Sequence, residues 1–341
     1  MKLRTNLLVI PFALALLLFP ALALCAAPGQ TGTERPDLAR LFEARGVEGC
    51  FVARTPEGIV RVNAARAAQR YRPASTFKIL NALVALESGV ALDTGKVLLW
   101  DGVKREVPLW NSDLSMNEAF RSSAVWYFVE IGKQNGRERL GKAMREVGYG
   151  NADASGSDQF WLDGPLRISA DEQALFMERL VRGEVPFVAR HRAMVARMML
   201  LEEGAGPKGT ATPGEGPHEA GRSGERWALY AKTGMARLGG GPGEAEENFV
   251  DMPVGWLVGW VERFPEGESR ANGVEKGGVE KNGAEKASSG APVRIPFALN
   301  IGPAAAQNKT SHPGAAPAPF GPARMEIAKD LLRELGVLPP K

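Results

Sequence analysis

The hydrophobic pattern of the chain has strand-like runs near both ends and helical spacing between them. Near the front, the apolar runs Cys50–Arg54 and Gly58–Asn63 flank Thr55-Pro56-Glu57, which predicts a β-hairpin. Three later runs predict further strands, at Trp227–Lys232, Gly255–Glu262 and Ile295–Ile301.

In the middle of the chain, apolar residues recur every three or four positions, which is typical of amphipathic helices. The helix expected over residues 76–88 ends at the stop signal Gly89. Another begins with a capping box, Ser169 followed by Glu172. That helix is expected at 169–182, and the remaining helices at 38–44, 117–121, 124–134, 138–147, 189–203 and 322–335.

This order predicts an α/β protein of the α+β type, in which strands from both ends form one antiparallel sheet packed against a helical lobe. A ligand site is then expected in the cleft between sheet and lobe. Four stretches rich in Gly, Pro, Ala and charge predict low-complexity insertions near 203–225, 238–247, 265–292 and 303–319. Passive loops are the favoured interpretation, and a functional role for any of them stays open.

The N-terminal segment has the three parts of a secretory signal peptide. Two basic residues precede an apolar stretch at 7–24, and small residues follow it. We therefore expect a signal peptide at 1–26, a linker at 27–37 and a folded domain at 38–341, in a secreted, periplasmic protein. An uncleaved membrane anchor and a lipoprotein attached at Cys25 are the alternatives.

Composition narrows the classes of partner. Lysine and arginine number 42 and aspartate and glutamate 39, so the charge balance gives no reason to expect nucleic acid or a membrane as a stable partner. Signal cleavage would leave Cys50 as a free, core-packed thiol without a disulfide. The three histidines have no metal-ligand spacing, so no metal is expected.

Candidate chemistry begins with Ser75-Thr76-Phe77-Lys78, at the start of the expected helix. Serine and lysine three residues apart share one helix face. A serine hydroxyl needs an adjacent base, and a lysine amine is a base only where a dry pocket keeps it neutral. Because Ser-x-x-Lys arises by chance about once in a chain of this length, it predicts a site only together with other motifs.

Two other motifs are candidates to complete such a site. Lys232-Thr233-Gly234 ends an expected strand, where a cation and a hydroxyl can hold a carboxylate and glycine admits a substrate. A plain surface strand end is the alternative. Ser123 precedes a helix, either as its cap or as a second hydroxyl that relays protons. Lys309-Thr310-Ser311 is a similar triplet inside an insertion and is treated as a decoy.

In this order and spacing, the three motifs resemble those of the penicillin-recognising serine enzymes. Finer detail resembles class D, the oxacillinase-type β-lactamases. It lies in Ser-Thr-Phe-Lys at 75–78, Ser-Ala-Val-Trp-Tyr-Phe at 123–128, Tyr-Gly-Asn at 149–151, Phe-Trp-Leu at 160–162 and Gly-Trp-Leu-Val-Gly-Trp at 255–260. The resemblance covers about residues 45–335 apart from the insertions. It implies the penicillin-recognising fold and hydrolysis of β-lactam antibiotics.

The resemblance also implies roles for single residues. Ser75 is the nucleophile, and Lys78 reacts with carbon dioxide or bicarbonate to form a carbamate that serves as base; no other cofactor is implied. Trp161 would donate to this carbamate, and Ser123 would pass a proton to the leaving nitrogen. The backbone N–H groups of Ser75 and Met235 would form the oxyanion hole. Pocket and substrate contacts are expected from Val125, Leu162, Lys232, Thr233, Gly234 and Arg324.

Rival functions stay open beside hydrolysis of a small-molecule β-lactam. A β-lactam sensor or a penicillin-binding peptidase would use the same serine but retain the acyl group. The single N-terminal apolar segment disfavours the sensor, and Trp161 with its neighbours disfavours the peptidase. A non-enzymatic secreted module would leave the coincidence of motifs unexplained. The preferred β-lactams, and the choice between monomer and homodimer, are not predicted.

Overall fold

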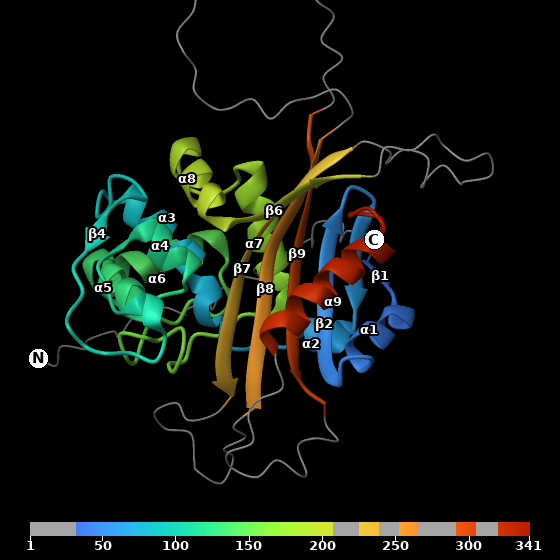
Figure 1. Cartoon of the computed structure of the whole chain (residues 1–341), viewed down its shortest axis with the longest axis horizontal. Helices are drawn as coiled ribbons and strands as arrows, with labels where there is room; N and C mark the ends of the chain where they lie inside the picture. The colour runs from blue at the N-terminus through green and yellow to red at the C-terminus, as the bar shows by residue number, and fades with distance from the viewer. Residues whose placement is uncertain (1–31, 207–224, 239–251, 265–290, 305–319) are drawn as a thin grey trace, which may run out of the picture. The chain divides into compact units, whose positions relative to one another are not determined.

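The computed structural model describes residues 32–206, 225–238, 252–264, 291–304 and 320–341. A seven-stranded sheet runs through these residues in the order β1-β3-β2-β9-β8-β7-β6 (Figure 1). Its strands are β1 (Gly32–Glu34), β3 (Gly58–Val62), β2 (Val47–Thr55), β9 (Val293–Pro303), β8 (Met252–Phe264), β7 (Arg226–Leu238) and β6 (Leu200–Ala205).

Every neighbouring pair in this sheet is antiparallel except β1 and β3, which run parallel. The N-terminal strands join the C-terminal strands where β2 pairs with β9, from Val47 opposite Pro303 to Ala53 opposite Phe297. The predicted antiparallel sheet built from both ends of the chain is therefore confirmed. The predicted hairpin is confirmed as β2 and β3.

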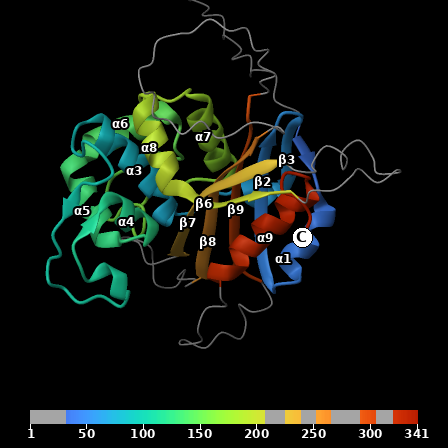
Figure 2. The ribbon, with the colours of Figure 1, turned by 45° about the horizontal axis from the view of Figure 1, so that its top comes forward.

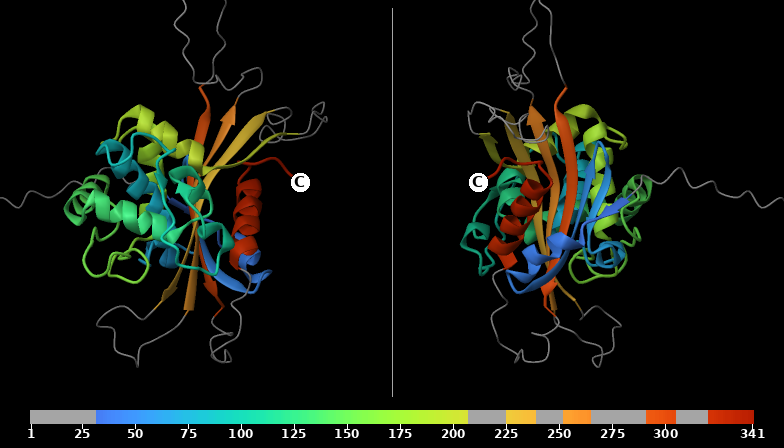
Figure 3. Two further views of the ribbon diagram at one scale, coloured as in Figure 1. Left: turned by 60° about the vertical axis from the view of Figure 1, so that its left-hand side comes forward. Right: turned by 90° about the vertical axis from the view of Figure 1, so that its right-hand side faces the viewer.

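Helices pack on both faces of the sheet. They are α1 (Arg40–Glu43), α2 (Ala64–Ala68), α3 (Lys78–Glu87), α4 (Met116–Arg121), α5 (Val125–Asn135), α6 (Arg137–Val147), α7 (Ala170–Arg182), α8 (Ala189–Met199) and α9 (Phe320–Glu334). Figures 2 and 3 show α1 and α9 on one face and the helical lobe that contains α3 to α8 on the other. A small two-stranded sheet, β4 (Val97–Leu98) with β5 (Leu114–Ser115), belongs to the lobe side of the chain.

The two faces of the sheet belong to two separate hydrophobic cores, and strand periodicity explains the separation. On β8, Trp256, Val258 and Trp260 belong to the core shared with the helical lobe. Leu257 and Val261, which alternate with them, belong to the core under α1 and α9. The near-continuous apolar sequence of β8 thus follows from its burial on both faces.

The sequence-based boundaries need correction at β6, β7 and β1. The helix expected to run to residue 203 ends at Met199, because Leu200–Ala205 turns into edge strand β6 and pairs with β7. The strand expected to end at Lys232 continues to Leu238, paired with β8 along its whole length. Residues 32–34, assigned to a linker, form edge strand β1.

Several predictions concern residues that lie wholly or largely outside the part of the chain that the structure describes. These are the signal peptide at 1–26, most of the four insertions, and the triplet at 309–311. Among the helices that are described, none is long and apolar enough to cross a membrane.

Candidate active site

The Ser75 hydroxyl lies on a tight turn between the sheet and α3. Residues Ala74–Phe77 form a 3-10 turn, and the α-helix itself begins only at Lys78, two residues later than expected. Ala74 has a φ of 51°, a left-handed conformation that costs a non-glycine residue on the order of 1–3 kcal/mol. Its N–H donates to the carbonyl of Trp161 at 3.0 Å. Ser75 therefore follows a strained residue that its surroundings hold in place.

Lys78 is fully buried directly behind the Ser75 hydroxyl. Its Nζ donates to Ser75 Oγ at 2.6 Å, and also to the carbonyl oxygen (2.9 Å) and the Oγ (3.2 Å) of Ser123. Burial, followed by the charge of Lys232, holds the pKa of Lys78 well below its usual value. Because each of these causes disfavours the ammonium form, the amine is available as a base or as a nucleophile towards carbon dioxide.

Ser123 lies in the link between α4 and α5 with a φ of 58°. The residue that caps α5 is Ala124, which makes no side-chain cap, so Ser123 is not a helix cap. Its hydroxyl receives hydrogen bonds from both Lys78 and Lys232. The oxygen is therefore shared by two lysine side chains, which favours the proton-relay interpretation over the structural one.

Lys232 approaches the same hydroxyl from the sheet side. Its Nζ donates to Ser123 Oγ at 3.0 Å and to the carbonyl of Thr233 at 3.1 Å. Burial, followed by the charge of Arg324, lowers the pKa of Lys232 to about 7. Lys232 and Thr233 lie inside strand β7, which packs against the turn that carries Ser75.

Gly234 permits this close packing. A Cβ at Gly234 would stand 3.0 Å from the carbonyl oxygen of Pro73 and 3.2 Å from a methyl carbon of Thr76. Both distances are shorter than ordinary van der Waals contact, so a side chain would force its neighbours to shift, and glycine lets β7 lie against the Ser75 turn. The next residue, Met235, exposes 44% of its surface at this end of the site.

Arg324 reaches the site from α9. Its Nη1 donates to the carbonyl of Gly234 at 2.8 Å, so the insertion before the helix has not moved it out of register. Burial lowers the pKa of Arg324 to about 10. The guanidinium thus lies beside Lys232, as the pKa of that lysine also indicates.

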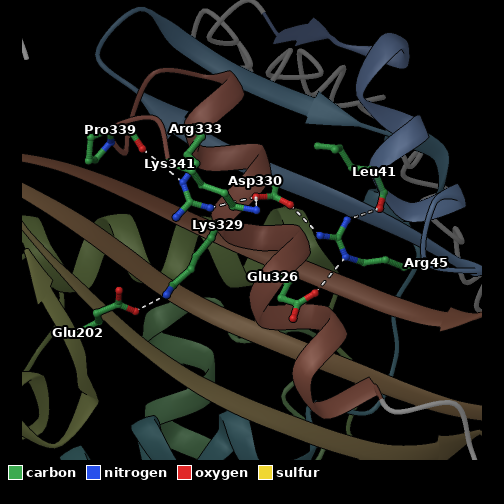
Figure 4. Close-up of polar contacts among 9 residues, drawn as sticks. All are labelled: Leu41, Arg45, Glu202, Glu326, Lys329, Asp330, Arg333, Pro339 and Lys341. Atoms are coloured by element: carbon green, nitrogen blue, oxygen red, sulfur yellow. Dashed lines mark hydrogen bonds and ion pairs between the residues drawn. The ribbon is translucent and has the colours of Figure 1, made fainter. Parts of the chain in front are cut away.

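A polar network holds the other end of α9 (Figure 4). Asp330 accepts from Arg45 at 2.7 Å, from Arg333 at 3.0 Å and from Lys341 at 3.1 Å. Lys329 forms an ion pair with Glu202 on β6. These contacts fix the helix whose first turns contain Arg324.

Trp161 is buried against the Ser75 turn, with its ring stacked on Phe77 at a centroid distance of 5.2 Å. Its indole Nε1 is buried and has no hydrogen-bond partner within the described part of the chain. A buried N–H donor without an acceptor is costly, so the site fits an additional acceptor group such as a carbamate oxygen on Lys78. Leu162 is half-buried against the lobe core, and Val125 is the first residue of α5.

These contacts join six residues into one site: Ser75, Lys78, Ser123, Lys232, Gly234 and Arg324. Among the described residues, no cluster of His, Cys, Asp and Glu could hold a metal ion. Sequence reasoning missed the strained backbone at Ala74 and the buried Gln173 beside Thr76. Neither has a recognisable local sequence signal, because both depend on segments distant in the chain.

Comparison with known proteins agrees with this geometry. Residues 51–269 match the family of the penicillin-binding protein transpeptidase domain. The chain is 33% identical over 234 residues to the β-lactamase OXA-3 of Pseudomonas aeruginosa, covering 67% of this chain and 72% of that protein. It is 37% identical to the probable β-lactamase YbxI of Bacillus subtilis, over 59% of this chain and 63% of the relative's length.

Solved structures give the same result. The class D β-lactamase YbXI from Nostoc aligns with a TM-score of 0.62 and 31% identity, covering 88% of this chain and 99% of that one. FUS-1 (OXA-85) of Fusobacterium nucleatum aligns with a TM-score of 0.65 and 25% identity, covering 90% and 100%. The fold is that of the penicillin-recognising serine enzymes, and within them the chain belongs to the class D β-lactamase family.

Proposed function

We propose that this protein hydrolyses the amide bond of β-lactam antibiotics through an acyl-enzyme on Ser75. The observation that carries the proposal is the fully buried Lys78 amine, held 2.6 Å from Ser75 Oγ with its pKa well below the usual lysine value. A serine becomes a nucleophile when a neighbouring base takes its proton. The named class D relatives support this assignment.

In acylation, Ser75 Oγ attacks the lactam carbonyl carbon while the hydroxyl proton passes to the Lys78 side chain. The carbonyl oxygen becomes an oxyanion, for which the backbone N–H groups of Ser75 and Met235 are the proposed donors. The C–N bond then breaks, and the ring nitrogen receives a proton from Ser123 Oγ. Since Lys232 and Lys78 both donate to that oxygen, each is placed to return a proton to it.

A carbamate on Lys78 would supply a general base for both acylation and deacylation. The Lys78 amine would hold it, and the proposed donor to it is Trp161 Nε1, which is buried and has no hydrogen-bond partner among the described residues. The substrate carboxylate would bind Thr233 and Arg324, with Lys232 adding positive potential. These are cationic and hydroxyl donors of the type that carboxylates prefer.

The nucleophile is tested by Ser75→Ala, which should abolish nitrocefin hydrolysis and the covalent penicillin adduct seen by mass spectrometry. Ser88→Ala is the matched control, because Ser88 lies beyond the last residue of the same helix, α3. Retained turnover in Ser75→Ala would disprove the nucleophile assignment. A wild-type acyl-enzyme that persists for hours would instead indicate a sensor or a penicillin-binding peptidase.

The carbamate is tested separately. Activity should rise with added bicarbonate and fall after degassing at low pH, and ¹³C-bicarbonate should give a carbamate resonance that is lost in Lys78→Met. Indifference of the rate to bicarbonate, together with no such resonance, would contradict the carbamate and leave the serine mechanism intact.

Export is proposed from the N-terminal pattern at 1–26. Expression of the full chain in a susceptible bacterium should raise penicillin resistance, and the mature N-terminus of the recovered protein should lie near residue 27. Recovery of the intact N-terminus in the membrane fraction would favour the anchor.

A further inference from the structure

The segment that leads into Ser75 is braced by a second segment, residues 161–173. Tyr71 and Ile168 exchange two backbone hydrogen bonds, of 2.9 and 2.8 Å. Closer to the nucleophile, the N–H of Ala74 donates to the carbonyl of Trp161. Both braces use backbone groups, which almost any sequence can provide.

The third brace uses side chains. Gln173, in the first turn of α7, donates from Nε2 to Thr76 Oγ1 at 2.7 Å, and Thr76 Oγ1 donates to the carbonyl of Pro73, also at 2.7 Å. Thr76 and Gln173 are both completely buried. Because this brace depends on residue type, it is the one that substitution can remove.

The direction of these bonds restricts which side chains can make them. A threonine hydroxyl has a single proton, and the Thr76 proton is used on the Pro73 carbonyl, which can only accept. Thr76 Oγ1 must therefore accept its second bond, so the residue at 173 must be a donor. The amide of Gln173 meets this requirement, whereas a glutamate carboxylate of the same shape does not.

The Pro73 carbonyl is the junction between the two halves of the proposed oxyanion hole. On one side it precedes strained Ala74 and the Ser75 N–H. On the other it stands 3.0 Å from the Cβ position of Gly234, next to Met235. A displacement of this carbonyl would tilt the nucleophile turn and change its spacing from β7.

We propose that Gln173 is a positioning residue for the nucleophile, which acts through the Thr76 hydroxyl to fix the Pro73 carbonyl and with it the turn at Ala74 and Ser75. The inference rests on the proposed function only in taking Ser75 as the nucleophile. Misplacement of a reacting group by about 1 Å can cost on the order of a hundredfold in rate, so a loss of about tenfold or more in acylation is expected when the brace is removed.

The test uses Gln173→Met and Thr76→Val, which keep side-chain volume close to the original but remove the hydrogen bonds. In stopped-flow acylation by a penicillin, both should lower the acylation rate constant about tenfold or more per folded molecule, with little change in the substrate dissociation constant. The double variant should be no slower than the slower single variant, since both remove the same brace. Gln173→Glu should be as slow as Gln173→Met.

Two further variants separate positioning from a general loss of stability. Thr76→Ser keeps the hydroxyl and should keep most of the acylation rate. Gln134→Met, at an exposed glutamine of α5, should leave the rate unchanged. Wild-type acylation rates in folded Gln173→Met and Thr76→Val, or rate losses that multiply in the double variant, would overturn the proposal.

A fluorophosphonate probe keeps this inference distinguishable from the proposed function, because it labels an activated serine without needing a β-lactam. If wild-type protein failed to react with penicillins, the proposed function would fail. Slower labelling of Gln173→Met than of wild type would still support the positioning role, and equal labelling would contradict it.

Discussion

The two faces of the central sheet differ in the polarity of the side chains that they bury. The core under α1 and α9 consists of apolar side chains, such as Phe51, Phe297 and Leu331, and its ion pairs lie at the rim, as between Arg40 and Glu334. The face towards the helical lobe buries charged and polar groups at Ser75, Thr76, Lys78, Asn81, Asn135, Gln173 and Lys232. Burying a polar group is costly unless it is hydrogen-bonded, and burying an uncompensated charge more so.

This difference between the two faces indicates that the lobe side accepts the cost of buried charged groups in order to form a reactive site. Lys78, Lys232 and Arg324 lie close together, and the pKa of each is lowered by burial. The contacts described for them are mainly to serine hydroxyls and backbone carbonyls. Such a site attracts anions, and the proposed substrate carboxylate and lysine carbamate are both anionic. Apart from Arg324, which reaches the site from α9, the described residues of the opposite core are apolar, so that core should act mainly as a support.

The strongest test of this contrast replaces the buried lysine. Lys78→Met should lower kcat by about a thousandfold or more, since it removes the proposed base beside the proposed nucleophile. The same change should leave the free energy of unfolding unchanged or raise it, because a buried amine is replaced by an apolar side chain. Nitrocefin kinetics and urea unfolding measure the two effects. A Lys78→Met protein that is both active and strongly destabilised would contradict the proposed difference between the two cores.

A truncation in the other core should show the opposite behaviour. Phe297→Ala should destabilise the protein by about 3–5 kcal/mol, because it opens a cavity beside Phe51 at the centre of a dry core. The kcat per folded molecule should remain close to that of wild type. Urea unfolding combined with titration of the active serine checks both values. A large fall in kcat at full folding would show that the supporting core also tunes the site.

Protonation of Lys232 should couple the site to pH. Its pKa in the folded protein is about 7, below the usual 10.5, so between these pH values the unfolded chain binds the additional proton. The free energy of unfolding should therefore increase as the pH rises from about 7 towards 10, by an amount on the order of a few kcal/mol. Lys232→Met should lack this part of the increase when urea unfolding is compared at several pH values.

The same loss of charge on Lys232, which should increase stability, should weaken the binding of the substrate. As Lys232 loses its charge above about pH 7, the KM for penicillins should rise, because positive potential near the substrate carboxylate is lost. The KM of Lys232→Met should be high and less dependent on pH. A wild-type KM that stays constant from pH 6 to pH 9 would contradict the role assigned to this lysine.

The smallest effect is expected at the rim of the apolar face. Glu334→Gln removes the ion pair with Arg40, whose side chains are 39% and 54% exposed. Exposed pairs of this kind contribute about 0–1 kcal/mol, so thermal and urea unfolding should change little and kcat should not change. A larger loss would show that α1 and α9 depend on the rim and not on the core between them.

Local patterning was sufficient for much of the architecture. Apolar alternation and helical spacing predicted the hairpin of β2 and β3, the three C-terminal strands and most of the helices. It failed at Leu200–Ala205, where the helical pattern of α8 gives way to a strand. The unpaired edge of β7 decided that conformation, because strand pairing depends on a partner that lies elsewhere in the sequence.

The chemical groups of the site can be read directly from the chain: Ser75 and Lys78 at helical spacing, Ser123, Trp161 and the Lys232-Thr233-Gly234 run. Their protonation, burial and hydrogen bonding follow from the folded structure. It buried Lys78 and lowered its pKa, brought Arg324 to the Gly234 carbonyl, left the Trp161 N–H without an acceptor within the described residues, and placed Gln173 on Thr76. Solvation and hydrogen bonding depend on neighbours in space, and those neighbours come from segments far apart in the chain.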